Sequence, residues 1–433
     1  MIKKARWLLM VWVFLFIGPV GAFGQYPKDI KKPDFKLAIK KPIPIKGLIC
    51  SLPIPLCPQE TSMWCWAASG EMVMQFVQPG LDVKQCEEAN RYFTRTDCCN
   101  SPVPGPCISG GWDVLASYGF SFNRKEGSPL SWEELNSQIC ANKPVMFAWA
   151  WDGGGGHMMV VTGISELIPS HQRFVHINNP WPPILGDTQV ISYDAWVNGD
   201  GYSFWAVYYD IQKKITKTLY PLLKEKLTRF PLEKTLMELN KTVDIKYKKL
   251  AVEGLKSLNR LVTEENAQAF GFYRKIDAGQ TTVGRPIREF RIQLDDLRSF
   301  LPTDDPKKII RGGQRLLFPV LSSGQISSAV RIDKYKETDR VHSYGNATLI
   351  KIIEGMVGSK TLNEDKLMVP LSTLEIPAIG LYFLTKEEAG KLWITSVFDE
   401  PSFGLKKGTY EPALDVYKRL QPFAKIGIFA PMR

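Results

Sequence analysis

The chain has 433 residues, of which 44% are hydrophobic, and it carries a formal net charge of +11. This length exceeds what one ordinary hydrophobic core holds, so the sequence predicts two domains or more. The excess of basic residues lies in 211–433, where it is interleaved with acidic residues and forms no basic run with aromatic spacing. This pattern argues against nucleic-acid binding, and no nucleic-acid partner is expected.

Residues 1–24 have the three-part layout of a secretory signal peptide. Three basic residues precede an apolar run from Trp7, and small residues follow up to Gly24. The run is short for a membrane span and is interrupted at Pro19, so removal is favoured over an uncleaved anchor. We therefore expect a secreted or periplasmic chain that begins at Gln25, and no other segment reaches 18 apolar residues.

Residues 25–48 hold seven Lys and four Pro, a composition that favours extended or disordered backbone. The segment is interpreted as a linker or a propeptide, or as an arm attracted to a charged surface. An exposed arm is the simplest of these interpretations.

All eight cysteines lie between residues 50 and 140, which predicts disulfides in one exported domain. No Cys-x-x-Cys pair accompanies them, so no zinc site is expected, and no other metal or cofactor is indicated. With Cys65 set aside, seven remain, which allows at most three bridges and leaves one thiol over. Four of these cysteines are expected to form two short bridges: Cys86, Cys98, Cys99 and Cys107. The adjacent Cys98 and Cys99 are not expected to bond to each other.

The periodicity places helices first and strands after them. That order predicts an α+β domain of about 160 residues over 49–211. Helices are predicted at 62–78, 81–93, 111–120 and 131–143. Strands are predicted at 144–151, 157–165, 173–180, 187–196 and 202–211.

Residues 212–265 read as a helical segment interrupted by Pro221 and Pro231. Residues 266–433 are predicted to form a second α/β or α+β domain, with a hairpin over 316–332 that turns near Ser323 and Gly324. No catalytic constellation is apparent in this part, and its role is not indicated. Its basic charge suits contact with an acidic cell surface or envelope. The sequence indicates no oligomeric state.

Cys65 stands between two tryptophans at the start of the helix predicted over 62–78. Unpaired N–H groups and the helix dipole favour a thiolate there, and the thiolate is the nucleophilic form. A buried structural cysteine is the alternative, and this stretch alone favours neither.

His157 is the best candidate for a base, because four glycines precede it at the head of a predicted strand. The glycines form no phosphate loop, since no Gly-Lys-Ser/Thr follows. They are expected to let the backbone pass close to another element and leave the imidazole reachable. A lone histidine is more often a core residue, whereas His171 looks exposed and His176 is interpreted as facing a sheet.

Asn179 ends the predicted strand that follows His157, so its amide is placed to orient the imidazole. Asn-Pro as a plain turn signal is equally compatible with the local sequence. Asp187 is a weaker alternative on a predicted loop. Gln59 lies six residues before Cys65, where its amide and the Cys65 N–H can meet at a developing oxyanion.

This ordered set resembles the papain-like cysteine peptidases, in particular their compact bacterial branch of effector proteases and bacteriocin leader peptidases. The resemblance rests on Gln59, "CWA" at 65–67, the Gly-rich turn into His157, and "NNPW"; the cysteine-bearing stretch 85–111 adds to it. It covers about 50–210. The 92-residue spacing from Cys65 to His157 fits the compact branch.

The resemblance implies a secreted cysteine peptidase acting on proteins or peptides through an acyl-enzyme. Cys65 would be the nucleophile, His157 the general base and acid, Asn179 the orienting residue and Gln59 the oxyanion donor. The compact branch often has Asp where this chain has Asn179, while larger papains use Asn. Two alternatives stay open: an acyl transferase or deamidase with the same residues, and a catalytically silent binding protein with 212–433 as the working part.

Overall fold

The computed structural model describes residues 49–168, 170–213, 243–264, 266–275, 280–335, 338–363 and 371–425. The predicted signal peptide and the Lys/Pro-rich segment up to residue 48 lie outside these residues, as do Pro221 and Pro231. Contacts group residues 45–433 into one unit, to which everything below refers.

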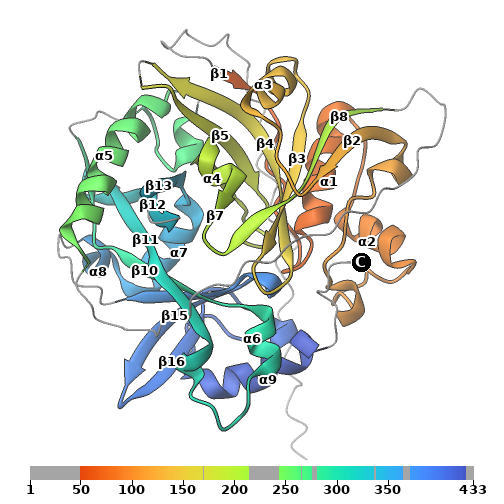
Figure 1. Ribbon diagram of the computed structural model, residues 1–433. Coiled ribbons are helices and arrows are strands. Elements are labelled where there is room, and N and C mark those ends of the chain that lie inside the picture. The colour runs from red at the N-terminus through yellow and green to blue at the C-terminus, as the bar shows by residue number, and fades with distance from the viewer. Residues whose placement is uncertain are drawn as a thin grey trace, which may run out of the picture. The chain divides into compact units, whose positions relative to one another are not determined.

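The first part of the described chain carries four α-helices, which lie around its strands (Figure 1). The helices are α1 (Cys65–Val77), α2 (Gln85–Phe93), α3 (Trp132–Cys140) and α4 (Tyr193–Val197). The strands are β1 (Ile49–Ser51), β2 (Phe120–Glu126), β3 (Val145–Trp151), β4 (Gly156–Leu167), β5 (Gln172–Asn179), β6 (Asp187–Ser192), β7 (Asn198–Gly199) and β8 (Tyr202–Lys213).

The second part begins with α5 (Ile245–Leu261) and is again a mixture of helices and strands. Its other helices are α6 (Leu294–Ser299), α7 (Ala347–Val357), α8 (Ser359–Asn363) and α9 (Ala413–Lys425). Its strands are β9 (Thr281–Val283), β10 (Ile287–Ile292), β11 (Ile310–Ser322), β12 (Gln325–Tyr335), β13 (Thr338–Gly345), β14 (Ser372–Ile376), β15 (Leu381–Glu388), β16 (Lys391–Ser396) and β17 (Glu411–Pro412).

One continuous sheet joins the two parts. In the first part β3 pairs with β8 and β4, and β5 lies between β4 and β6, all antiparallel. β6 then pairs antiparallel with β13, with Val190 opposite Tyr344, and the sheet continues through β12, β11 and β10. Only the β10–β14 pairing is parallel among the described strands. This antiparallel-dominated α+β architecture confirms the predicted fold class.

Hydrophobic packing also crosses between the parts. Helix α1 contacts β3, β4 and β8. Trp64 and Trp66, the two tryptophans beside Cys65, are buried, with exposed fractions of 0% and 1%. A second cluster joins Leu167 and Phe174 of the first part to α5 and to strands β11 to β13. Met63 packs in the same way among residues of α6, β14 to β16 and α9. The boundaries predicted near residues 211 and 265 stay predictions.

Two predicted elements differ from the structure. The sequence predicts a helix over 111–120, but these residues form only a short 3-10 turn at Leu115–Tyr118. The turn ends because Gly119 takes a φ of +76°. The alternating residues that follow form β2, which pairs with β8. The strand predicted to reach residue 196 stops at Ser192, whose hydroxyl accepts from Ala195 N and caps α4. The hairpin turn at Ser323 and Gly324 is confirmed.

Three disulfides form: Cys50–Cys140, which joins β1 to α3, and Cys86–Cys99 and Cys98–Cys107, which brace α2 and the loop that follows it. They confirm that the adjacent cysteines bond elsewhere and that two short bridges form among the four clustered cysteines. Cys57 and Cys65 lie outside the three bonds.

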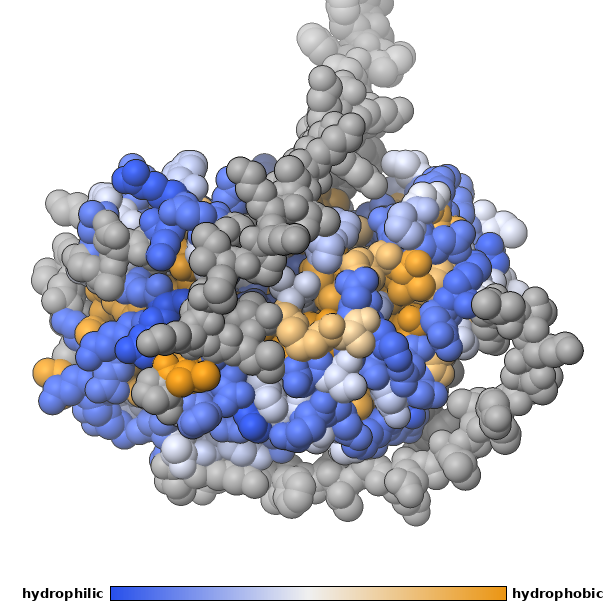
Figure 2. Space-filling view, turned by 90° about the horizontal axis from the view of Figure 1, so that it is seen from above, coloured by the Kyte–Doolittle hydropathy of each residue, from blue (hydrophilic) through white to orange (hydrophobic). Residues whose placement is uncertain are grey.

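The described surface is mainly polar. On the face shown in Figure 2, hydrophilic residues predominate and hydrophobic ones gather in small areas. Among the described residues no helix has both the length and the apolarity that a membrane crossing requires. The large hydrophobic side chains that are exposed are Ile168, Ile184, Leu185, Ile245, Val252, Tyr273 and Leu301.

Candidate active site

The four residues singled out in the sequence line one cavity of about 520 Å³. Gln59 approaches it from the segment before α1, Cys65 from the first residue of α1, His157 from the start of β4 and Asn179 from the end of β5. A volume of this size is typical of a ligand site. The structure therefore brings together side chains that are up to 120 residues apart in the chain.

His157 and Asn179 form the central contact of the site. β5 runs antiparallel to β4 with Val160 opposite Asn178, which places the end of β5 beside the start of β4. The His157 Nε2 lies 2.7 Å from Asn179 Oδ1. The backbone N–H of Trp181 also donates to Asn179 Oδ1, at 3.0 Å, which identifies that atom as the amide oxygen.

This contact sets the tautomer of His157. Because the amide oxygen only accepts, Nε2 must carry the hydrogen, and Nδ1 of the neutral ring keeps its lone pair. Burial lowers the pKa of His157 to about 4, although the bond to Asn179 acts in the opposite direction. The imidazole is therefore neutral at pH 7, with Nδ1 as the available base. The ring also stacks near Trp151, with centroids 6.4 Å apart.

Cys65 has the helix-terminal position that the sequence predicts but not the low pKa. Burial raises the pKa of the thiol to about 11, while backbone N–H groups of Met158, Trp66 and Cys65 itself lower it to a smaller extent. Removal from water disfavours the anion more than three dipoles favour it. Burial therefore favours a neutral thiol, in a cavity that the neutral imidazole of His157 also lines.

The glycines before His157 have the role expected of them. Gly153, Gly154 and Gly155 have φ values of +84°, +112° and +79°, which favour glycine. A Cβ at Gly155 would lie 2.7 Å from the Cβ of Ala378, so the turn passes directly against the second part of the chain.

Gln59 is held rigidly beside the cleft. Its backbone N–H donates to Pro180 O at 2.9 Å and its carbonyl accepts from Ile184 N at 2.9 Å. Its side-chain Nε2 donates to Thr61 O at 2.7 Å. Since a primary amide has two N–H groups, one of them stays available for an oxyanion.

The comparison with known families bears on this same segment. Residues 50–195 match the family model described as papain-like cysteine protease AvrRpt2. This segment is therefore similar to papain-like cysteine peptidases, and it is called the papain-like domain below. The match confirms the resemblance stated from the sequence, and no curated protein matches the chain.

The other polar residues considered in the papain-like domain have structural partners. Asp187 does not orient His157: its carboxylate accepts from Thr188 N at 2.9 Å and from backbone N–H groups at the start of α7. His176 Nε2 lies 2.9 Å from Ser165 Oγ, and the exposed His171 Nδ1 lies 2.8 Å from Glu166 Oε1.

Sequence reasoning missed the residues that the second part of the chain adds to the cavity. Strands β11 to β15 and their connections contribute two arginines, a histidine, a carboxylate and a tyrosine to its wall. No local signal in 266–433 marks them, because they are scattered over almost 70 residues and meet only through the sheet.

The pKa of Cys65 predicts the pH dependence of its alkylation by iodoacetamide. A group with a pKa raised to about 11 is protonated at lower pH, so its thiolate fraction rises about tenfold per pH unit between pH 7 and 9. The labelling rate of the Cys65 peptide, followed by mass spectrometry, should rise in the same proportion, and His157→Ala should keep this slope. A rate that is flat from pH 5 to 8 would instead reveal a preformed thiolate–imidazolium pair.

Proposed function

We propose that the chain is a cysteine peptidase that hydrolyses peptide bonds through an acyl-enzyme. Cys65 is the nucleophile, His157 the base and acid, Asn179 the residue that positions the imidazole, and Gln59 a donor to the oxyanion. The papain-like family supports a protein or peptide as substrate. The 2.7 Å contact between His157 Nε2 and Asn179 Oδ1, in the cavity that Cys65 lines, is the observation that carries the proposal.

The first half-reaction starts from neutral partners. As the sulfur attacks the peptide carbonyl carbon, the thiol proton moves to His157 Nδ1, and the carbonyl oxygen gains the negative charge. The side-chain N–H of Gln59 and the backbone N–H of Cys65 stabilise that oxygen. The imidazolium then protonates the leaving nitrogen, the C–N bond breaks, and a thioester remains.

The second half-reaction uses the same groups. His157 takes a proton from water, whose oxygen attacks the thioester carbon. Collapse of the tetrahedral intermediate releases the new carboxyl group, and the sulfur regains its proton from the imidazolium. Asn179 keeps Nδ1 aimed at the cleft in both steps, because Nε2 stays bonded to its oxygen.

Product analysis in H₂¹⁸O tests this function. A pool of synthetic decapeptides should be cleaved, and each new carboxyl terminus should gain one ¹⁸O, whereas transfer to an amine would give no such product. Gln59→Ala should release the same products about 100-fold more slowly and leave iodoacetamide labelling of Cys65 unchanged, because alkylation forms no oxyanion. Absence of cleavage by the unmodified chain would overturn the proposal.

A further inference from the structure

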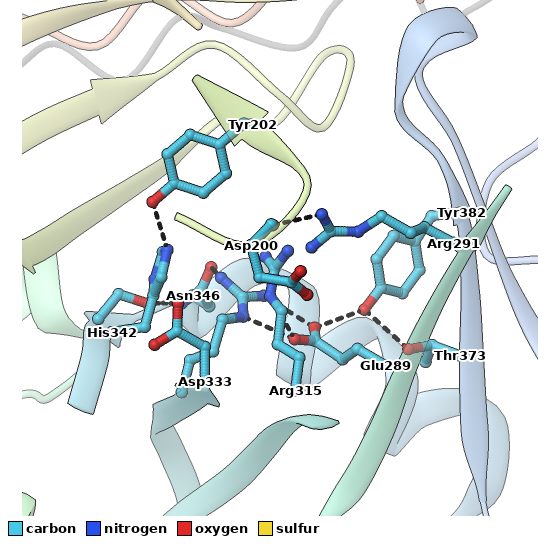
Figure 3. Close-up of polar contacts among 12 residues, drawn as sticks. Asp200, Tyr202, Glu289, Arg291, Arg315, Asp333, His342, Asn346, Thr373 and Tyr382 are labelled. Carbon is cyan, nitrogen blue, oxygen red and sulfur yellow. Dashed lines mark hydrogen bonds and ion pairs between the residues drawn. The ribbon is translucent and has the colours of Figure 1, made fainter. Parts of the chain in front are cut away.

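The second part of the chain supplies a polar wall to the cavity that Cys65 and His157 line. It is built from neighbouring strands of the continuous sheet and the start of α7, and Figure 3 shows four of its side chains, those of Arg315, His342, Asn346 and Tyr382. The cavity-lining members, here called the arginine wall, are Arg315, Arg331, His342, Asn346, Glu375 and Tyr382. None of them lies in the segment that matches the papain-like family.

Each guanidinium nitrogen of Arg331 has a hydrogen-bond partner in or beside the wall. Its Nε and Nη2 donate to the two carboxylate oxygens of Glu289, at 2.8 and 2.9 Å, and its Nη1 donates to Asn346 Oδ1 at 3.2 Å. Tyr382 donates its hydroxyl to Glu289 Oε1 at 2.9 Å. This closed arrangement holds the wall in place.

Arg315 differs from Arg331 in having a donor to spare. Its Nε lies 3.0 Å from Glu289 Oε2, but without the geometry of a hydrogen bond. This Nε is the Arg315 nitrogen that is buried without a hydrogen-bond acceptor among the described residues. Its side chain is only 13% exposed, so bulk water does not easily replace a missing acceptor.

His342, which also lines the cavity, holds a second buried atom without a partner. Tyr202 donates its only hydroxyl hydrogen to Ala195 O, so the 2.9 Å contact between Tyr202 and His342 Nε2 requires that Nε2 donates. Burial and four nearby arginines hold the pKa of His342 well below its usual value, so the ring is neutral. Its Nδ1 is then an acceptor, and it is buried without a partner.

Arginines predominate among the most deeply buried charges around the wall. Six charged side chains of the cluster in Figure 3 are less than a fifth exposed, and they comprise four cations and two anions. Glu375 and Asp200, which are half-buried, add two negative charges and balance the two excess positive ones. The six are Arg291, Arg315, Arg331, Arg340, Glu289 and Asp333.

We propose that the arginine wall binds a carboxylate of the peptide that lies in the cavity. The carboxylate, from an acidic side chain or a chain terminus, accepts from Arg315, and the backbone N–H of the same residue donates to His342 Nδ1. A peptide residue with a carboxylate is a ligand that satisfies both unpartnered atoms at once. The inference rests on the proposed function in that it names the substrate class of the same cavity.

Binding to the full chain carrying Cys65→Ala tests this inference without any need for catalysis. The immobilised chain is offered a randomised decapeptide pool, half with a terminal carboxylate and half with a terminal amide, and bound peptides are read by mass spectrometry. We expect about tenfold enrichment of acidic residues at one position, or of the terminal acids, because charge-assisted hydrogen bonds to a buried guanidinium are strong. The first result assigns an acidic side chain and the second a chain terminus.

Arg315→Gln in the same background should reduce this enrichment to less than twofold. Arg260→Gln removes an equal charge from the exposed face of α5 and should leave it unchanged. Arg315→Lys retains the charge and should keep part of the preference for acidic peptides. This variant therefore distinguishes a loss of the charge from a loss caused by misfolding. Circular dichroism and the melting temperature of each variant accompany the binding data.

Three outcomes overturn the inference: no enrichment, enrichment spread evenly over all positions, or enrichment that survives Arg315→Gln. Enrichment that is equal at all positions and disappears in 0.5 M salt would indicate attraction to the basic surface alone. The proposed function is judged separately, by cleavage in the unmodified chain. Cleavage with no acidic preference discards only the arginine wall, and acidic binding without cleavage discards only the peptidase.

Discussion

Replacement of Cys65 by alanine is expected to lower peptide hydrolysis by about 10⁴-fold or more. The change removes the only atom that forms the acyl bond, and neither Gln59 nor His157 can substitute for it. It should leave the fold intact, because the sulfur contributes little to the packing of α1, whose buried face is formed by residues such as Trp66, Ala67 and Met72. Hydrolysis of a peptide pool and far-ultraviolet circular dichroism measure the two effects.

Cys57→Ala is the matched control for Cys65→Ala. Cys57 also lies outside the three disulfides, so it reports the general effect of removing a thiol of this domain. We expect hydrolysis within twofold of the unmodified chain. Undiminished hydrolysis in Cys65→Ala, or an equal loss in both variants, would contradict the assignment of the nucleophile.

Replacement of Glu289 by alanine is expected to lower the free energy of unfolding by about 3–5 kcal/mol. Glu289 is 7% exposed and accepts two hydrogen bonds from Arg331 and one from Tyr382, with Arg315 at ion-pair distance. Its loss leaves two nearly buried guanidinium groups without their anion. Urea unfolding followed by tryptophan fluorescence measures the change.

Glu388→Ala provides the control for Glu289→Ala. Glu388 pairs with Lys386 at 3.2 Å but is 66% exposed, and exposed ion pairs contribute about 0–1 kcal/mol. A loss of similar size in both variants would show that the buried arginine cluster contributes no special stability.

Glu289 also predicts that the fold loses stability in acid. Burial alone would raise the pKa of Glu289, but Arg331 and Arg315 outweigh it and lower the pKa to about 2, below the ordinary value of 4.5. A carboxyl whose pKa is lower in the folded state stabilises the fold above pH 4.5, and this contribution is lost as pH falls towards 2. The unfolding free energy of the unmodified chain should therefore decrease over that interval, and Glu289→Ala should lack this part of the decrease.

The arginine wall and the glycine turn give the second part of the chain a direct place in the candidate site. Ala378 packs against Gly155, two residues before the imidazole, and the Trp181 indole donates to Gly380 O at 3.1 Å. The turn before His157 and the segment after Asn179 are thus both buttressed by residues outside the papain-like domain. Positions 377–380 are consequently part of the support of the site.

The sequence alone determined the local features of this protein. Cys65 at a helix start, glycines before His157, Asn179 at a strand end and the turn at Ser323 and Gly324 all follow from short-range patterns of a few residues. Local backbone preference and periodicity set these features, so the order of the amino acids is enough to predict them. The α+β class and the pairing rules of the clustered cysteines follow from the same kind of information.

Only the tertiary structure decided the electrostatics and the far wall of the cavity. The pKa of Cys65 depends on the burial of the thiol, which outweighs the helix terminus that the sequence shows. The arginine wall depends on the pairing of β6 with β13, which joins residues about 150 positions apart. Such pairing is selected by the packing of whole sheet faces, and no local pattern specifies it.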